Sequence, residues 1–149
     1  MYEVSIREGC EADAKEAIEV LCRSIFELCE PDHNNDPDEI SDWISNKTER
    51  AWTTWLARDD AAVYVAIKNN EIVGVGMVSE KGEVLLNYVS PDARFSGVSK
   101  AVLRTLEAYV RDKGANECFL ESTVTAKKFY ESFGYTSQKD GKLELRKSI

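Results

Sequence analysis

The segment SPDARFSGVSKAVL, residues 90–103, places a single glycine at a turn that opens a helix. It follows the strand-forming run EVLLNYV, residues 83–89, and after it Val102, Leu103 and Leu106 recur at helical spacing. A strand that passes directly into a helix leaves the first N–H groups of the helix unpaired and converging on one point. Such a point attracts an anion, so this turn predicts an anion-binding site.

Composition limits the class of protein. The 149 residues suit one domain over residues 1–149, and 19 basic against 27 acidic side chains give a formal net charge of −8. An acidic surface repels nucleic acid and anionic membranes, so neither is expected as a partner. The charged start MYEVSIREGCEADAKE lacks the apolar core of a signal peptide, and no run reaches membrane-spanning length.

The cysteines show no close pairing of the Cys-x-x-Cys kind: they are Cys10, Cys22, Cys29 and Cys118. Without an export signal, we expect reduced and mostly buried thiols in a cytoplasmic protein. The usual spacing of metal ligands is missing around Cys29, Asp32 and His33, so no metal is expected.

Periodicity predicts a mixed sheet with helices on both faces, in the order β-α-α-β-β-β-α-β-α-β-β. The run CEPDHNNDPDE, residues 29–39, has two prolines and several turn formers, so we expect it to break regular structure as far as Asp36. Asp36 before Pro37 resembles an N-cap followed by a proline at the first helical position. The expected elements are strand 2–8, helix 12–28, a short helix from Pro37 through Ile44, helix 48–56, a hairpin over 61–80 around Asn69-Asn70, strand 83–90, a helix from the turn to about Lys113, strand 117–122, helix 125–133 and a hairpin over 135–147.

The turn at Gly97 has three possible interpretations. The glycine could merely ease a change from strand to helix, because one glycine is a weak signal. A phosphate-binding P-loop is disfavoured, since the Gly-Lys-Ser/Thr ending is absent. A dinucleotide-binding fold is disfavoured as well, because its three spaced glycines belong to an early βαβ unit, whereas this turn follows a run of successive strands.

A second segment, about 30 residues later, separates these interpretations. Arg94-Phe95-Ser96-Gly97-Val98-Ser99 resembles the Arg/Gln-x-x-Gly-x-Gly/Ala signature of the GNAT superfamily of acetyl-CoA-dependent N-acetyltransferases. Phe129-Tyr130-Glu131-Ser132-Phe133-Gly134-Tyr135 resembles its second signature, a helix that ends in FYxxxGF/Y. The order of elements is similar over nearly the whole chain. The resemblance implies a GNAT-type mixed, mostly antiparallel sheet of about seven strands.

The resemblance also implies that the turn holds the pyrophosphate of acetyl-CoA. Gly97 lacks a Cβ, so phosphates can approach the backbone at the positive end of the helix dipole. Two positions depart from the family pattern: Ser99 stands where Gly or Ala is usual, and Thr123 stands where an asparagine often contacts the cofactor arm. The implied cofactor-binding residues are Tyr88, Val89, Arg94, Phe95, Ser96, Gly97, Val98, Ser99, Lys100 and Thr123.

Three residues are candidates for catalysis by the same resemblance. Tyr130 occupies the position of a tyrosine that protonates the departing thiolate; a core aromatic residue is the alternative. Glu83 occupies the position of a general-base glutamate, or is a solvated charge. Strand alternation places Glu83, Leu85, Asn87 and Val89 on one face, so Asn87 could orient the amine or a water molecule.

The region between the first two helices usually forms the acceptor side of such enzymes. His33, Asp32 or Asp36 could contact the acceptor there, although a polar turn is the simpler explanation, because Asn, Asp and Pro favour turns. Trp43, Trp52 and Trp55 fit helix packing, and one of them could line the acceptor pocket.

The sequence therefore predicts acetyl transfer from acetyl-CoA to a primary amine of a small molecule or a protein, by direct attack and without a metal. The alternatives are a non-catalytic acyl-CoA-binding or regulatory module and a nucleotide-binding domain. The C-terminal hairpin is expected to leave a strand edge exposed at Leu143 and Leu145, which predicts a homodimer.

Overall fold

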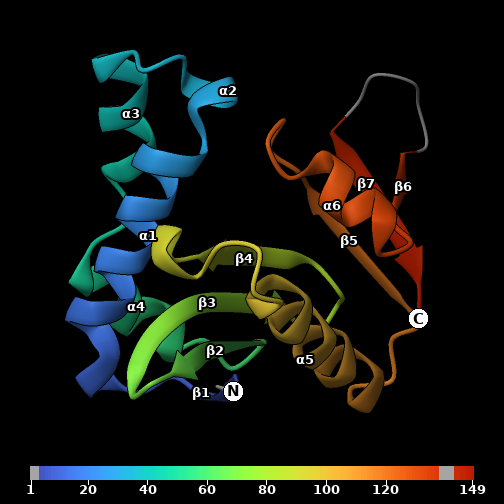
Figure 1. Cartoon of the computed structure of the whole chain (residues 1–149). Coiled ribbons are helices and arrows are strands. Elements are labelled where there is room, and N and C mark those ends of the chain that lie inside the picture. Colours follow the sequence, from blue (N-terminus) through green and yellow to red (C-terminus); the bar gives the residue numbers. More distant parts are fainter. Residues whose placement is uncertain (1–3, 138–142) are drawn as a thin grey trace.

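The computed structural model describes residues 4–137 and 143–149, and within them it has seven strands and six α-helices (Figure 1). The strands are β1 (Ser5–Glu8), β2 (Ala61–Lys68), β3 (Glu71–Ser79), β4 (Val84–Val89), β5 (Glu117–Glu121), β6 (Thr136–Ser137) and β7 (Glu144–Ser148). The helices are α1 (Ala14–Leu28), α2 (Glu30–His33), α3 (Pro37–Ile44), α4 (Glu49–Leu56), α5 (Val98–Asp112) and α6 (Lys127–Ser132). Two short 3-10 turns, Glu11–Asp13 and Pro91–Ala93, precede α1 and α5.

The predicted α/β class is confirmed, but four helices, α1 to α4, lie between β1 and β2 where the predicted order has two. Three of the four match the expected helices over residues 12–28, 37–44 and 48–56, and α2 was not expected. The region predicted to be irregular, residues 29–36, contains the single turn of α2 before the left-handed residues Asn34 and Asn35. The capping predicted at Asp36 is present, because its carboxylate accepts hydrogen bonds from Asp38 N and Glu39 N. None of the described helices is long and apolar enough to cross a membrane.

The first sheet runs in the order β1-β2-β3-β4 and every pair in it is antiparallel. Helices α1 and α4 cover one of its faces and α5 covers the other. Helix α5 lies close to β3 because two glycines face it: a Cβ on Gly74 would lie 2.7 Å from Val98 Cγ1, and one on Gly76 would lie 2.4 Å from Val102 Cγ1. This packing fixes the N-terminus of α5 against the sheet.

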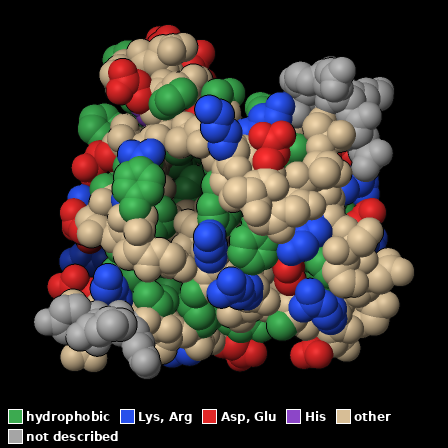
Figure 2. Space-filling model, turned by 45° about the vertical axis from the view of Figure 1, so that its right-hand side comes forward, with side chains coloured by type: hydrophobic (Ala, Val, Ile, Leu, Met, Phe, Trp, Pro, Cys, Tyr) green, Lys and Arg blue, Asp and Glu red, His purple; other side chains and the backbone are tan. Residues whose placement is uncertain are grey.

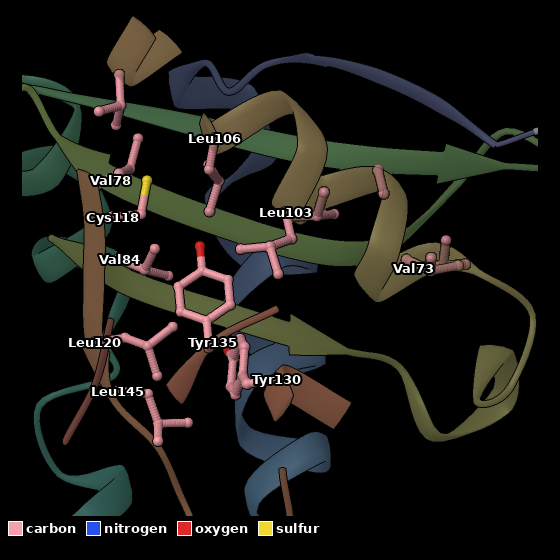
Figure 3. Close-up of a cluster of buried hydrophobic side chains, with 14 of the residues drawn as sticks. Val73, Val78, Val84, Leu103, Leu106, Cys118, Leu120, Tyr130, Tyr135 and Leu145 are labelled. Atoms are coloured by element: carbon pink, nitrogen blue, oxygen red, sulfur yellow. The ribbon is translucent and has the colours of Figure 1, made fainter. Parts of the chain in front are cut away.

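The second sheet runs in the order β5-β7-β6, and its inner face joins the core beneath α5 (Figure 3). Tyr130 and Tyr135 lie edge to face in this cluster, with ring centres 5.7 Å apart. The hydroxyl of Tyr135 donates to the buried carboxylate of Glu107 at 2.8 Å, and Lys147 Nζ lies 3.1 Å from both oxygens of that carboxylate. This ion pair ties α5 to β7.

The expectation of an exposed edge at Leu145 is wrong. Strand β7 is the middle strand of its sheet and pairs with both β5 and β6, so its edges are not exposed. The Leu145 side chain is fully buried because it packs in the core cluster with α5. The predicted turn of this hairpin falls on residues 138–142, outside the described residues. The homodimer stays a prediction that this edge does not support.

The two sheets meet at one point. Phe119 N donates to Gly82 O at 2.9 Å, and Glu83 forms a parallel bridge with Phe119. The backbone approaches so closely that a Cβ on Gly82 would lie 2.1 Å from Glu117 O. Across the described residues this is the one bridge between the sheets, so β4 and β5 diverge beyond it.

A β-bulge in β4 corrects the predicted faces of that strand. Val84 pairs with Val78 and Leu86 pairs with Met77, so Leu85 is an extra residue. Asn87 lies opposite Gly76, on the α5 face with Val84 and Val89, whereas Leu85, Leu86 and Tyr88 pack with the α1 cluster. Simple alternation is broken at Leu85, so placing Leu85 on the face of Asn87 was wrong.

Candidate active site

The divergence of β4 and β5 leaves a cavity of about 480 Å³ between the two sheets. Its walls come from β4, the C-terminal half of α1, the turn before α5, the end of β5 and α6. Figure 2 shows a hollow in the surface with Lys and Arg side chains around it. Three stretches that are distant in the sequence, within residues 24–29, 84–100 and 120–130, thus contribute to one site.

One edge of β4 faces this gap. Ser90 N donates to Val73 O at 2.7 Å, so Tyr88 and Leu86, which lie two and four residues earlier, also direct their backbone groups to β3. The N–H and C=O groups of Asn87 and Val89 therefore point away from β3 and toward the cavity. A bound molecule with amide and carbonyl groups can pair with them.

The turn predicted from the sequence forms one end of the cavity. Gly97 is the N-cap of α5 with φ of 83°, and neither a side-chain cap nor an acidic residue occupies its first turn. The first helical hydrogen bond runs from Ala101 N to Gly97 O, so the N–H groups of Val98, Ser99 and Lys100 precede it. A Cβ on Gly97 would meet nothing within 4 Å, so the space above it is open to an anion.

The predicted residues of this turn divide into two groups. Ser96 does not line the cavity, because its hydroxyl donates back to Ala93 O and ties the turn together. The others do line it: Arg94, Phe95, Gly97, Val98, Ser99 and Lys100. The hydroxyl-bearing Ser99 thus lies at the wall, where it is able to donate to a bound anion.

Tyr130 lies in the cavity wall and is only 7% exposed. Burial raises the pKa of its phenol to about 12, although a hydrogen bond from the Asn87 side chain favours the phenolate and acts in the opposite direction. The phenol is therefore protonated at neutral pH. The Asn87 Oδ1 atom is buried and has no partner among the described residues, so it is free to accept a hydrogen bond from a bound group.

Tyr88 lines the cavity from the opposite face of β4. Burial raises the pKa of its phenol to about 12, whereas a hydrogen bond with Trp43 of α3 lowers it. This contact gives Trp43 a defined role, because it fixes a side chain in the wall of the site.

Glu83 is not brought into the site. Its side chain is exposed and does not line the cavity. Asp60 raises the pKa of Arg58, which follows α4, and the charge of Glu83 raises that pKa to a lesser extent. The one carboxylate among the described cavity-lining residues is Glu121, at the end of β5. Its neighbour Leu120 packs in the α5 cluster, so Glu121 faces away from that cluster. No local motif in the sequence marked this residue.

An interaction between distant segments holds the loop before α6, from which Thr123 and Thr125 line the cavity. The Asp32 carboxylate accepts hydrogen bonds from Val124 N at 2.6 Å, from Thr125 N at 3.2 Å and from Thr125 Oγ1 at 2.6 Å. Thr123 lines the cavity, and its Oγ1 accepts a hydrogen bond from Ala126 N at 3.1 Å. Thr123 therefore stabilises the turn that precedes α6 and retains a hydroxyl proton that it is able to donate.

His33 is structural. It is 1% exposed, its Nε2 lies 2.9 Å from Ile25 O, and its Nδ1 accepts a hydrogen bond from Asn35 N. Cys29 lines the cavity, but burial, with a smaller effect of Asp32, raises the pKa of its thiol to about 12, so it stays a neutral thiol. The described residues contain no cluster of His, Cys, Asp and Glu that could hold a metal, and their four cysteines are unpaired.

Residues 31–144 match the family description "Acetyltransferase (GNAT) domain". The chain belongs to the GNAT acetyltransferase family. It is 26% identical over 147 residues to the uncharacterized N-acetyltransferase YafP of Escherichia coli (strain K12), covering 98% of this chain and 90% of YafP.

Solved structures of GNAT proteins share the fold. A PaiA N-acetyltransferase from Thermoplasma acidophilum, crystallised in complex with coenzyme A, superposes with a TM-score of 0.84 at 20% identity, covering 99% of both chains. A GCN5-related N-acetyltransferase from Rhodopseudomonas palustris gives a TM-score of 0.87 at 18% identity, covering 97% of this chain and 95% of that one.

The residues of this GNAT site fit coenzyme A. The open space above Gly97 accepts phosphates beside the unpaired N–H groups of α5, and the free edge of β4 offers partners to an amide-containing arm.

We expect Gly97→Val to weaken coenzyme A binding by at least about tenfold, because the new side chain fills the space above the helix N-terminus. Gly114→Val is the matched control, since Gly114 ends the same helix with φ of 89° and open space around it. Both variants should lose a similar free energy of unfolding, about 1–2 kcal/mol from left-handed strain. Calorimetric titration that finds equal affinities in the two folded variants would contradict this role.

Proposed function

We propose that the protein transfers the acetyl group of acetyl-CoA to a primary amine of a small molecule or a protein. One observation supports this proposal above the others. A single cavity takes in the N-terminus of α5, the unpaired edge of β4 and the protonated phenol of Tyr130. These are an anion site, a row of backbone partners and an acid, which are the three groups that acyl transfer from a phosphorylated thioester requires.

Acetyl-CoA supplies an activated acetyl thioester when it is bound. The turn at Gly97 holds its phosphates, and the backbone of Val89 pairs with its arm. The N–H of Asn87 points into the gap, where it donates to the acetyl carbonyl oxygen and stabilises the negative charge that develops there. These groups are fixed by β3 and α5, so they need no rearrangement during the reaction.

Proton transfer uses two side chains. The amine nitrogen attacks the carbonyl carbon, the carbon–sulfur bond breaks, and Tyr130 gives its proton to the sulfur. The hydrogen bond that Asn87 donates stabilises the phenolate left behind. Glu121, acting directly or through a water molecule, takes the proton that the amine loses, and exchange with solvent then restores both residues. Glu121 replaces Glu83 in this role because Glu83 lies outside the cavity.

Release of free thiol from acetyl-CoA with a panel of primary amines tests the activity directly. Turnover with at least one amine is the expected result. Binding of acetyl-CoA without turnover for every amine would instead indicate a non-catalytic acyl-CoA-binding module.

We expect Tyr130→Phe to lower kcat and kcat/KM by about 10²–10⁴-fold, because a positioned acid acts mainly in the transition state. Stability and acetyl-CoA affinity should change little. In the wild type, a phenol with pKa near 12 stays protonated below that pH, so the pH–rate profile should show no decline from Tyr130 up to about pH 10.

Tyr135→Phe is the matched control, because Tyr135 packs against Tyr130 but does not line the cavity. Its loss of the hydrogen bond to Glu107 should lower the free energy of unfolding by about 1.5–3 kcal/mol while turnover is kept. Unimpaired turnover in Tyr130→Phe would remove Tyr130 as the acid.

We expect Glu121→Gln to lower kcat/KM for the amine by about 10²-fold or more near neutral pH, whereas Glu83→Gln leaves it unchanged. The deficit should shrink toward about pH 10, where an alkyl amine loses its proton without help. The measurement is kcat/KM of both variants from about pH 6 to 10. Loss of activity in Glu83→Gln alone would return the role of base to Glu83.

A further inference from the structure

Phe95 stands out among the described apolar side chains, because it is 91% exposed. The other large hydrophobic side chains with high exposure are Phe26 at 58% and Val124 at 54%, on different elements. Phe95 also lines the cavity, at the turn that leads into α5. An aromatic ring in water beside a binding cavity is a surface available for a ligand.

The backbone holds this ring in place at a conformational cost. Phe95 has φ of 65°, in the left-handed region that bulky side chains rarely adopt. Upstream, Ser90 caps the 3-10 turn Pro91–Ala93, and downstream Gly97 is left-handed as well. Strained residues of this kind persist where the surroundings fix them, and they concentrate at ligand sites.

Arg94 completes the surface. Its guanidinium carbon lies 4.6 Å from the centre of the Phe95 ring, which is a cation–π contact. Arg94 lines the cavity too, so an aromatic face and a positive charge lie together at its rim. A purine nucleotide carries the two complementary groups, a flat aromatic base and phosphate.

The phosphate site and the ring are close. Consecutive Cα atoms are about 3.8 Å apart, so the Cα atoms of Phe95 and Gly97 lie within about 7.6 Å of each other. In coenzyme A the adenosine is attached directly to the pyrophosphate. A pyrophosphate seated at the N-terminus of α5 therefore brings the adenine within reach of Phe95.

We propose that the Phe95 ring, backed by Arg94, is the platform on which the adenine of coenzyme A stacks, with Arg94 facing its phosphates. The proposal rests on coenzyme A as the ligand of the proposed function, and it does not depend on the acceptor. Stacking is tolerant of the exact base, so the platform contributes affinity for the nucleotide end and takes no part in the chemistry.

Ligand truncation tests the platform. Coenzyme A and 4′-phosphopantetheine share the arm, and only coenzyme A carries the adenosine. Phe95→Asn removes the ring but suits the left-handed backbone, so the turn is kept. Phe95→Trp keeps an aromatic face, and Phe26→Ala removes an exposed phenylalanine outside the cavity.

By calorimetry, Phe95→Asn should raise the Kd for coenzyme A by about 5- to 100-fold, the range that base–aromatic stacking gives on substitution. The Kd for 4′-phosphopantetheine should stay unchanged, Phe95→Trp should bind coenzyme A like the wild type, and Phe26→Ala should alter neither Kd. Adenosine 3′,5′-bisphosphate should bind the wild type more tightly than Phe95→Asn.

Two results would overturn the platform while leaving the proposed function intact. One is an equal loss of affinity for coenzyme A and 4′-phosphopantetheine, which would mean that Phe95 shapes the phosphate turn. The other is no change for coenzyme A in Phe95→Asn. Failure of the wild type to bind coenzyme A at all would instead remove the cofactor on which both proposals depend.

Discussion

The hydrogen bond from Phe119 N to Gly82 O holds the two sheets together at one end, and the rest of the site depends on it. Because β4 and β5 meet there and then diverge, the cavity opens between them. The approach requires glycine, since a Cβ on Gly82 would lie 2.1 Å from Glu117 O. Asp32 joins α2 to the loop before α6, and Thr123 and Thr125 of that loop line the cavity.

The divergence of β4 and β5 also explains why backbone groups of a strand and of a helix N-terminus face the same cavity. A fully paired β4 would direct the backbone groups of Asn87 and Val89 into a ladder, whereas the diverging strand leaves them facing the cavity. Helix α5 packs closely on β3 because Gly74 and Gly76 lack side chains, and its N-terminus therefore points toward the same cavity. Tyr130 comes from α6, which packs in the same core, so its burial and its protonated state follow from the packing.

The sequence predicted the features that local patterns encode. The order of elements follows from periodicity and turn residues, and Gly97 and Tyr130 lie in contiguous motifs, so their places in the cavity wall could be expected. The position of Glu83 relative to the cavity could not be predicted in this way. The bulge at Leu85 breaks the alternation of faces along β4, and the residue pattern does not reveal a bulge. The contact between Asp32 and Thr125 spans 93 residues and depends on tertiary packing. Glu121 joins the cavity only through the meeting of the sheets, and α2, a single polar turn, has no periodicity to detect.

The central claim is that the open edge of β4 pairs with the arm of coenzyme A. Residue-resolved amide hydrogen exchange of the free and the coenzyme A-saturated protein tests it most directly. The Tyr88 amide, already paired with β3, should exchange slowly in both states. The amides of Asn87 and Val89 should exchange rapidly in the free protein and at least about tenfold more slowly with coenzyme A, because binding supplies their missing partners. Equal exchange of these two amides in both states would contradict the account.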